Sequence, residues 1–254
     1  MKKIKLNKEQ LHRGHLILIN HELPIIGGNE KQMLPADQRY PDILLEREAA
    51  TVYAYIISLL EASEKIVPVS GYRTAVEQAD IYSSSLTENG DEFTRKYVAL
   101  PGHSEHQSGL AIDLGLAGDS IDFICPEFPY DGIAESFRSL SVNYGFIERY
   151  KQDKEHITHI SHEPWHFRYV GYPHSAIMER ECMCLEEYIT FLKGFEKGKR
   201  QLKIELDGKS FEIFYVPLNI RDSAEILLPE KALYNVSGNN SDGFIITVWD
   251  DMRK

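Results

Sequence analysis

The chain has 254 residues, of which 43% are hydrophobic and 26% charged, an ordinary balance for a globular protein with a sizeable core. Acidic residues outnumber basic ones by 39 to 28, and the formal net charge of −11 argues against nucleic acid or an anionic membrane as a partner. No segment approaches the roughly 18 to 20 apolar residues of a membrane span. The basic N-terminus is not followed by the apolar run of a signal peptide, and three cysteines make no disulfide framework. We therefore expect a cytoplasmic protein.

The first half of the chain contains signals for a loop, two helices and a strand. Residues 21–43 are rich in Pro, Gly, Asn and Gln, which favours a long loop. Apolar residues at helical spacing predict a helix over 43–64, and a short β-prone run predicts a strand over 66–69. Thr74 and Glu77 then form the T-x-x-E pattern of a capping box, so a second helix should begin there.

Helices and strands continue in the second half without the regular alternation of a parallel α/β fold. Residues 110–114 and 165–170 alternate as strands do, while 131–144 and 184–195 have helical spacing. This mixture indicates an α+β domain.

The C-terminal region differs in character. Residues 202–216 read as a hairpin around an Asp-Gly turn, and 244–249 as a further strand. We therefore predict two parts: a catalytic domain over 1–197 and a small β-rich appendage over 198–254.

Two short segments carry the residue types of a metal site. His106 stands just before the predicted strand 110–114, in which Asp113 faces away from the apolar side chains. His166 lies on the strand 165–170, and Glu163 lies on the turn before it. Two imidazoles and one carboxylate make a catalytic zinc set with a fourth position for water, and a further carboxylate that is not a ligand can take the water's proton.

These segments resemble a known family. S-E-H-Q-S-G-L-A-I-D, residues 104–113, fits the S-x-H-x-x-G-x-A-x-D pattern of the VanY-type and VanX-type zinc D,D-peptidases. E-P-W-H-F-R-Y-V-G, residues 163–171, is similar to their E-x-x-W-H segment, and S-G-Y-R-T, residues 70–74, to the segment with their catalytic arginine. Order and spacing agree over roughly residues 40–192, and the resemblance is nearest to the bifunctional VanXY enzymes.

The resemblance implies a compact α+β fold shared with the signalling domain of Hedgehog proteins. It also implies one Zn²⁺ per chain, held by three ligands: His106, Asp113 and His166. Glu163 would be the catalytic base and Arg73 the group that polarises the scissile carbonyl, while Ser104 and Gln78 would line the substrate pocket. The implied activity is hydrolysis of D-Ala-D-Ala and of the terminal D-Ala of peptidoglycan precursors, in support of vancomycin resistance. The partner is thus a small peptide ending in D-Ala-D-Ala.

Several features leave alternatives open. Ser70 stands where VanX-type dipeptidases carry an Asp that would meet the free ammonium of a dipeptide. His159 and His162 stand where the family usually has Gly and Tyr, and we take both as non-ligands. A zinc endopeptidase acting on cell-wall cross-links is a second enzyme hypothesis, and a binding protein that kept zinc but lost catalysis is a third.

Overall fold

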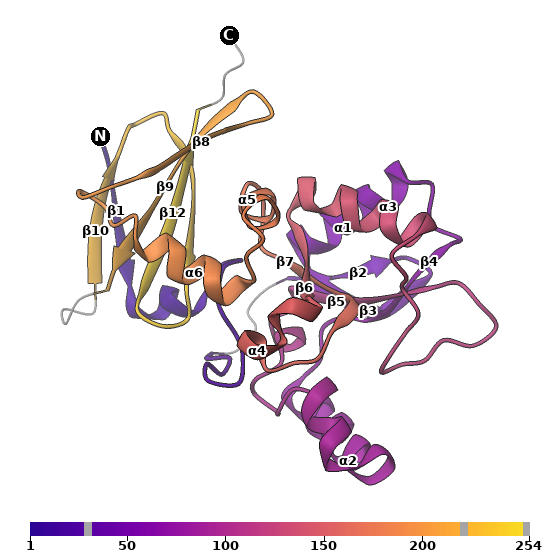
Figure 1. Ribbon diagram of the computed structural model, residues 1–254. Coiled ribbons are helices and arrows are strands. Elements are labelled where there is room, and N and C mark those ends of the chain that lie inside the picture. Colours follow the sequence, from indigo (N-terminus) through magenta and orange to yellow (C-terminus); the bar gives the residue numbers. More distant parts are fainter. Residues whose placement is uncertain (28–31, 219–222, 251–254) are drawn as a thin grey trace. The chain divides into compact units, whose positions relative to one another are not determined.

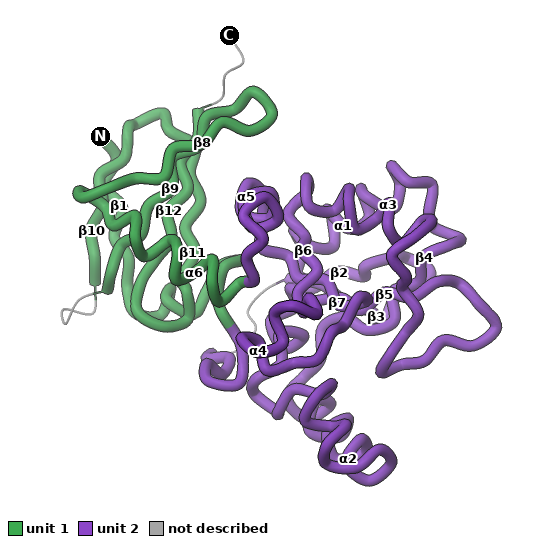
Figure 2. The backbone as a smooth tube through the Cα atoms, in the orientation of Figure 1, with its two compact units in different colours: residues 1–18, 185–254 green, residues 19–184 purple. Residues whose placement is uncertain are grey.

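Figure 1 shows a computed structural model of the chain, which describes residues 1–27, 32–218 and 223–250. Contacts divide the chain into two compact units, coloured separately in Figure 2. One unit comprises residues 19–184, and the other joins residues 1–18 to residues 185–254. None of the described helices is both long and apolar enough to cross a membrane.

The centre of the 19–184 unit is a four-stranded sheet in the order β4-β5-β7-β6, with all neighbours antiparallel. Its strands are β4 (Ile66–Ser70), β5 (Ala111–Leu116), β6 (Phe146–Tyr150) and β7 (Glu163–Tyr169). Three of them occupy segments predicted from strand periodicity, and β6 does not. The predicted mixture of helices and strands is thus confirmed.

Helices surround this sheet, with α1 and α3 above it and α2 below it in the view of Figure 1. The helices of the unit are α1 (Arg47–Leu59), α2 (Ala75–Tyr97), η2 (Glu105–Ser108), α3 (Gly132–Ser141), η3 (Val142–Tyr144), η4 (Gln152–Lys154), α4 (Glu155–Thr158) and α5 (His174–Arg180). The predicted capping box begins α2, because the Thr74 hydroxyl accepts from the backbone of Glu77 and the Glu77 side chain accepts from the backbone of Thr74.

One face of the sheet is closed by aromatic packing. Phe167 of β7 lies edge-on to Phe137 of α3, with ring centroids 5.0 Å apart, and also meets Phe128 at 5.5 Å. All three rings are at most 2% exposed. Burying each stabilises the unit by about 1.5–3 kcal/mol. Alternate residues of β7 therefore point to the opposite face, which is free to carry polar groups.

The predicted loop over residues 21–43 is wrong for its described second half; residues 28–31 lie outside the described part of the chain. β2 (Met33–Asp37) and β3 (Tyr40–Glu46) form an antiparallel pair in which Leu34 lies opposite Leu45. The sequence did not predict this pairing, because both strands are very short and the polar residues Gln38 and Arg39 form the turn between them.

The second unit contains two small antiparallel sheets. The first pairs β1 (Lys2–Asn7) with β10 (Ser223–Leu228), and the second has the order β11-β12-β9-β8. Its other elements are η1 (Lys8–His12), α6 (Leu185–Lys193), β8 (Leu202–Leu206), β9 (Lys209–Pro217), β11 (Leu233–Gly238) and β12 (Gly243–Trp249). The predicted hairpin is confirmed, with Asp207 and Gly208 at φ of 49° and 70° in its turn.

The two units do not coincide with the division expected at residue 197. Residues 1–18 and α6 group with the C-terminal strands. The physical reason is β1, whose pairing with β10 joins the two ends of the chain. Leu6 of β1 and Leu11 of η1 are 0% and 5% exposed, in one apolar cluster with β9, β10 and β12.

We expect residues 19–184 to fold as an independent unit and a chain ending at residue 197 to fold poorly. The 1–197 fragment would contain β1 without its partner β10. It would therefore expose Leu6 and Leu11, each at a cost of about 1.5–3 kcal/mol. Thermal unfolding followed by circular dichroism and dye binding to exposed apolar surface measure this. An aggregating 19–184 fragment beside a well-folded 1–197 fragment would contradict the division.

Candidate metal centre

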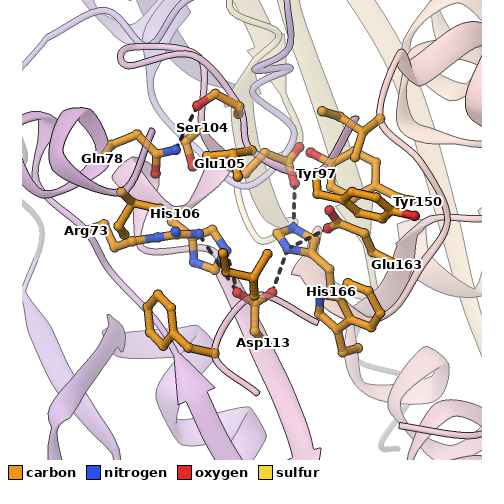
Figure 3. Close-up of a pocket in the computed structure, with 17 residues that line it drawn as sticks. Arg73, Gln78, Tyr97, Ser104, Glu105, His106, Asp113, Tyr150, Glu163 and His166 are labelled. Atoms are coloured by element: carbon orange, nitrogen blue, oxygen red, sulfur yellow. Dashed lines mark hydrogen bonds and ion pairs between the residues drawn. The ribbon is translucent and has the colours of Figure 1, made fainter. Parts of the chain in front are cut away.

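Two neighbouring strands bring two of the predicted ligands side by side. Asp113 of β5 lies directly opposite His166 of β7 in the antiparallel register, so their side chains share a face. His106 comes from η2, immediately before β5. The three side chains converge in Figure 3 and are 7%, 4% and 2% exposed, respectively. Their face of the sheet is the one that Phe167 leaves free.

His106 faces Asp113 with an acceptor nitrogen. Its Nδ1 donates to the carbonyl oxygen of Gly71 at 2.7 Å, so the neutral ring carries its lone pair on Nε2. Nε2 lies 3.1 Å from Oδ2 of Asp113. Burial and the nearby Arg73 lower the pKa of His106 to about 4, so the ring is neutral at pH 7. A neutral acceptor nitrogen and a carboxylate oxygen at this distance are suited to sharing a cation.

His166 presents Nδ1 to the other carboxylate oxygen of Asp113, Oδ1, at 2.8 Å. Burial alone lowers the pKa of His166, but the hydrogen bond and the negative charge of Asp113 raise it to about 9. One ligand atom each from His106, Asp113 and His166 lies within 4.8 Å of the others. Two nitrogens and one oxygen are the donor set of catalytic zinc sites, and the residues fit that ion. A metal ion held at Nδ1 would have to displace the proton there.

Glu163 lies beside this group without belonging to it. Its Oε2 is 3.7 Å from Nδ1 of His166, and the side chain is buried. It is the first residue of β7, opposite Tyr150, rather than part of the turn that the sequence suggested. Burial raises the pKa of Glu163 to about 8. A carboxylate is most effective as a general base when its pKa lies near the working pH, as it does here at neutral pH.

Arg73 approaches the group from the segment between β4 and α2. One Nη atom lies 3.9 Å from Oδ2 of Asp113, and the backbone N–H of Arg73 donates to the carbonyl oxygen of His106 at 3.3 Å. Within the described residues, its buried Nε has no hydrogen-bond partner. A guanidinium with a spare buried donor, held beside the predicted ligands, is placed to bind a carbonyl oxygen that gains negative charge.

Ser104 and Gln78 line the same cavity, as the sequence suggested. Both are buried, and the Gln78 amide donates to the carbonyl oxygen of Ala99 at 2.8 Å. Its Oε1 has no partner among the described residues and is an acceptor directed at the pocket. Ser70 is also buried and pairs with Asp113 across β4 and β5.

The two unusual histidines lie outside the metal-compatible group. The His162 ring stacks on Tyr130, and its Nε2 is 2.6 Å from the Tyr130 hydroxyl and 3.6 Å from a Glu148 oxygen. His159 meets the ring of His21 at 4.2 Å. The His162 ring therefore lies against Tyr130 and Glu148.

Glu105 is a functional candidate that sequence reasoning missed. Its Oε1 accepts from Nε of Arg149 at 2.9 Å and from an Nη of Arg168 at 2.7 Å, and all three side chains are fully buried. Its Oε2 faces Nε2 of His166 at 3.6 Å. Burial alone would raise the pKa of Glu105, but the two guanidinium groups hold it well below its usual range. The carboxylate therefore stays charged behind the proposed ligand, where it can hold the Nε2 proton and leave Nδ1 for the metal.

A signal for this arrangement was present in the sequence. Arg168 lies two residues after His166 and so on the same face of the strand, and a buried arginine requires an acidic partner. Nothing local in the sequence identified that partner as Glu105, which precedes Arg168 by 63 residues.

We expect Glu105→Gln to weaken zinc binding by about 10- to 100-fold, as is typical when the partner of a ligating histidine is removed. The variant should also be less stable, because Arg149 and Arg168 lose their charge partner. Glu148→Gln is the matched control: Glu148 is buried and bonds Arg138 at 2.6 Å, but it lies opposite Phe167 in the sheet and so on the other face from His166. Competition with a chromophoric chelator measures both affinities. Equal zinc affinities in the two variants would show that Glu105 acts only on stability.

The chain is similar to several known proteins. The family model VanY, D-alanyl-D-alanine carboxypeptidase, matches residues 42–172. The chain is 44% identical over 179 residues to the bifunctional D-Ala-D-Ala dipeptidase and D-Ala-D-Ala carboxypeptidase VanXYC of Enterococcus gallinarum, covering 70% of this chain and 94% of the relative.

Two solved structures are also similar. The vancomycin resistance D,D-dipeptidase VanXYg, in complex with a D-Ala-D-Ala phosphinate analogue, superposes with a TM-score of 0.95 at 52% identity, over 98% of this chain and 99% of that one. A mutant of the D,D-pentapeptidase VanY from a VanB-type resistance cassette, in complex with Zn(II), superposes with a TM-score of 0.59 at 28% identity, over 69% and 98%. The first similarity spans both units, and the second is limited to about two thirds of this chain.

Proposed function

This chain belongs to the VanY family of D-alanyl-D-alanine carboxypeptidases, and we propose that it is a zinc-dependent D,D-peptidase that cleaves both free D-Ala-D-Ala and precursor peptides ending in it. The observation that carries the proposal is the convergence of His106, Asp113 and His166, with Glu163 beside this group but outside it. The biological role of this protein is vancomycin resistance, by hydrolysis of D-Ala-D-Ala and of the terminal D-Ala of precursor peptides.

His106 Nε2, one carboxylate oxygen of Asp113 and His166 Nδ1 would hold one zinc ion per chain. Bound there, zinc supplies Lewis acidity and lowers the pKa of water. Glu163 takes the proton of the attacking water and returns it to the amine of the departing D-Ala. Arg73 donates to the carbonyl oxygen as its negative charge develops, which by comparison with oxyanion-hole donors is worth about 3–4 kcal/mol.

Ser104 and Gln78 complete the pocket around the substrate. Among the described residues the Oε1 of Gln78 has no partner, and Ser104 offers a hydroxyl; both residues line the cavity that also contains Arg73 and Glu163. The Gln78 oxygen can accept from an amide N–H of the substrate, and the Ser104 hydroxyl can donate to a carbonyl or carboxylate oxygen. We place the reaction in the cytoplasm, where precursor peptides are made, and fractionation of the host cell tests that location.

The two other hypotheses are less well supported. Glu163 and Arg73 are both present beside the ligand group, which disfavours a zinc protein without catalysis. An endopeptidase would cleave a peptide whose C-terminus is blocked, whereas a D,D-carboxypeptidase requires the free terminal D-Ala. Assaying one peptide in its free and C-terminally amidated forms separates them.

We expect cleavage of D-Ala-D-Ala and of a pentapeptide ending in it, with poorer cleavage of D-Ala-D-Ser. Fit alone rejects an added hydroxyl by no more than about 100-fold, so the preference should be finite. The measurement is release of the C-terminal amino acid by zinc-replete protein, as kcat/KM on the three substrates under one set of conditions. Equal values for D-Ala-D-Ala and D-Ala-D-Ser would exclude the resistance role. Cleavage of the pentapeptide alone would leave a carboxypeptidase, consistent with Ser70 in place of Asp.

A further inference from the structure

A second and larger cavity adjoins the catalytic pocket. It encloses about 380 Å³, against about 50 Å³ for the pocket that contains the metal-compatible group. Val98, Ala99, Tyr150 and Ile160 line both cavities. The Tyr150 ring lies 4.8 Å from the ring of His166, and Figure 3 shows it beside Glu163. A peptide that is bound at the catalytic group can therefore continue past Tyr150 into the second cavity.

The lining of this second cavity is basic on a chain that is otherwise acidic. Of its twelve described lining residues none is Asp or Glu, although the chain has 39 of these and a net charge of −11. Besides the shared wall, the lining consists of Asn20, His21, Tyr82, Arg95, Leu100, His103, Thr158 and His159. The lining thus carries one guanidinium, that of Arg95, and no carboxylate, which favours an anionic over a cationic ligand because local charge and not net charge sets the potential inside a cavity.

Two of these side chains are oriented by neighbours that leave other nitrogens available. Asp91 accepts from Nε of Arg95 at 2.8 Å, and among the described residues the two terminal Nη groups have no partner. Such a pair is the geometry that binds a carboxylate through two parallel hydrogen bonds. The Nδ1 of His103 donates to the carbonyl oxygen of Asn20 at 2.7 Å, which fixes the ring and leaves Nε2 of the neutral imidazole as an acceptor.

The direction of the substrate chain limits what this ligand can be. D-Ala-D-Ala ends in its own carboxylate, so a longer substrate extends only on the amino side of the dipeptide. We propose that the second cavity binds a carboxylate carried by the precursor peptide on that amino side, with Arg95 as its principal donor. This inference rests on the proposed function. The cavity then serves the carboxypeptidase reaction, since a free dipeptide is too short to fill both spaces.

The test compares Arg95→Gln with Lys96→Gln in the full-length, zinc-replete protein. Lys96 is the neighbouring residue of α2, bears the same charge and pairs with Glu92 four residues earlier, just as Arg95 pairs with Asp91, but it does not line the cavity. The substrates are D-Ala-D-Ala, a pentapeptide ending in D-Ala-D-Ala with one upstream side carboxylate, and the same pentapeptide with that carboxylate as its primary amide.

In Arg95→Gln we expect the ratio of kcat/KM for the carboxylate pentapeptide to kcat/KM for the dipeptide to fall by about 10- to 100-fold, the range for one charge-assisted hydrogen bond. Lys96→Gln should keep the ratio, and the amide pentapeptide should show no difference between the two variants. Equal ratios in both variants, or an equal fall for the carboxylate and amide peptides, would overturn the proposal. A parallel loss on dipeptide and pentapeptide would also overturn it, because the ligand would then be the terminal carboxylate. Absence of dipeptide and pentapeptide cleavage in the unaltered protein would instead refute the proposed function.

Discussion

Glu163→Ala is expected to retain zinc and to lower kcat/KM for D-Ala release by about 10²- to 10⁴-fold, the usual contribution of a general base. The carboxylate is 3.7 Å from Nδ1 of His166 but is not a member of the metal-compatible group, so its removal leaves all three proposed ligands in place. Because burial raises its pKa to about 8, Glu163 is also the group whose basicity suits transfer of a proton near neutral pH. Zinc content and D-Ala release on one preparation measure both effects.

Glu148→Gln is the control for loss of a buried glutamate, since Glu148 pairs with Arg138 and is not one of the residues lining the catalytic pocket. It should retain both zinc and turnover once folding is confirmed. Near-normal turnover in Glu163→Ala would mean that another group takes the proton. His162 is an unsuitable substitute, because its Nε2 is occupied by the Tyr130 hydroxyl at 2.6 Å. Loss of zinc in Glu163→Ala would make Glu163 a ligand and would contradict its assignment as a base.

The strands that carry the proposed ligands were predictable because alternation along a strand is a local property. Leu110, Ile112 and Leu114 alternate with Asp113, and Trp165 and Phe167 alternate with His166. Each of these two runs therefore predicts a strand with one polar face. The register that sets Asp113 opposite His166 is not local, because 53 residues separate them and only the folded sheet aligns them.

β6 shows why other elements escaped prediction. Its five residues are all buried, yet Glu148 and Arg149 lie in its centre, which masks the apolar run expected of a buried strand. Glu148 bonds Arg138, and Arg149 bonds Glu105. A buried charge is acceptable only with such partners, and these come from other elements of the chain. For the same reason the sequence did not predict that Glu105 lies beside His166.

β1 is a different case: its sequence has the alternation of a strand, but no neighbouring segment of the sequence is its pairing partner. Ile4 and Leu6 alternate with lysines and asparagine over residues 2–7, which is the pattern of a strand with one buried face. A single strand cannot satisfy its backbone, and the strand that does so, β10, lies at the other end of the chain. The division of the chain between its two units depends on that distant pairing.

His166→Ala is expected to lose most of the zinc and, with it, release of D-Ala. The substitution removes Nδ1, one of only two nitrogens in the metal-compatible group, and leaves a single imidazole with Asp113. Such a pair is below the three protein ligands that catalytic zinc sites use. It also leaves the buried carboxylates of Asp113 and Glu105 without the ring between them, so stability should fall as well. His174→Ala is the matched control, since His174 is a buried histidine of α5 outside the group and its loss should leave zinc at one per chain. Elemental analysis after exhaustive dialysis, on fractions shown to be folded, separates loss of the ligand from loss of the fold. Full zinc content with normal turnover in His166→Ala would show that His166 is not a ligand. The assignment of Glu163 as the base, which relies on its position beside His166, would then lose its support.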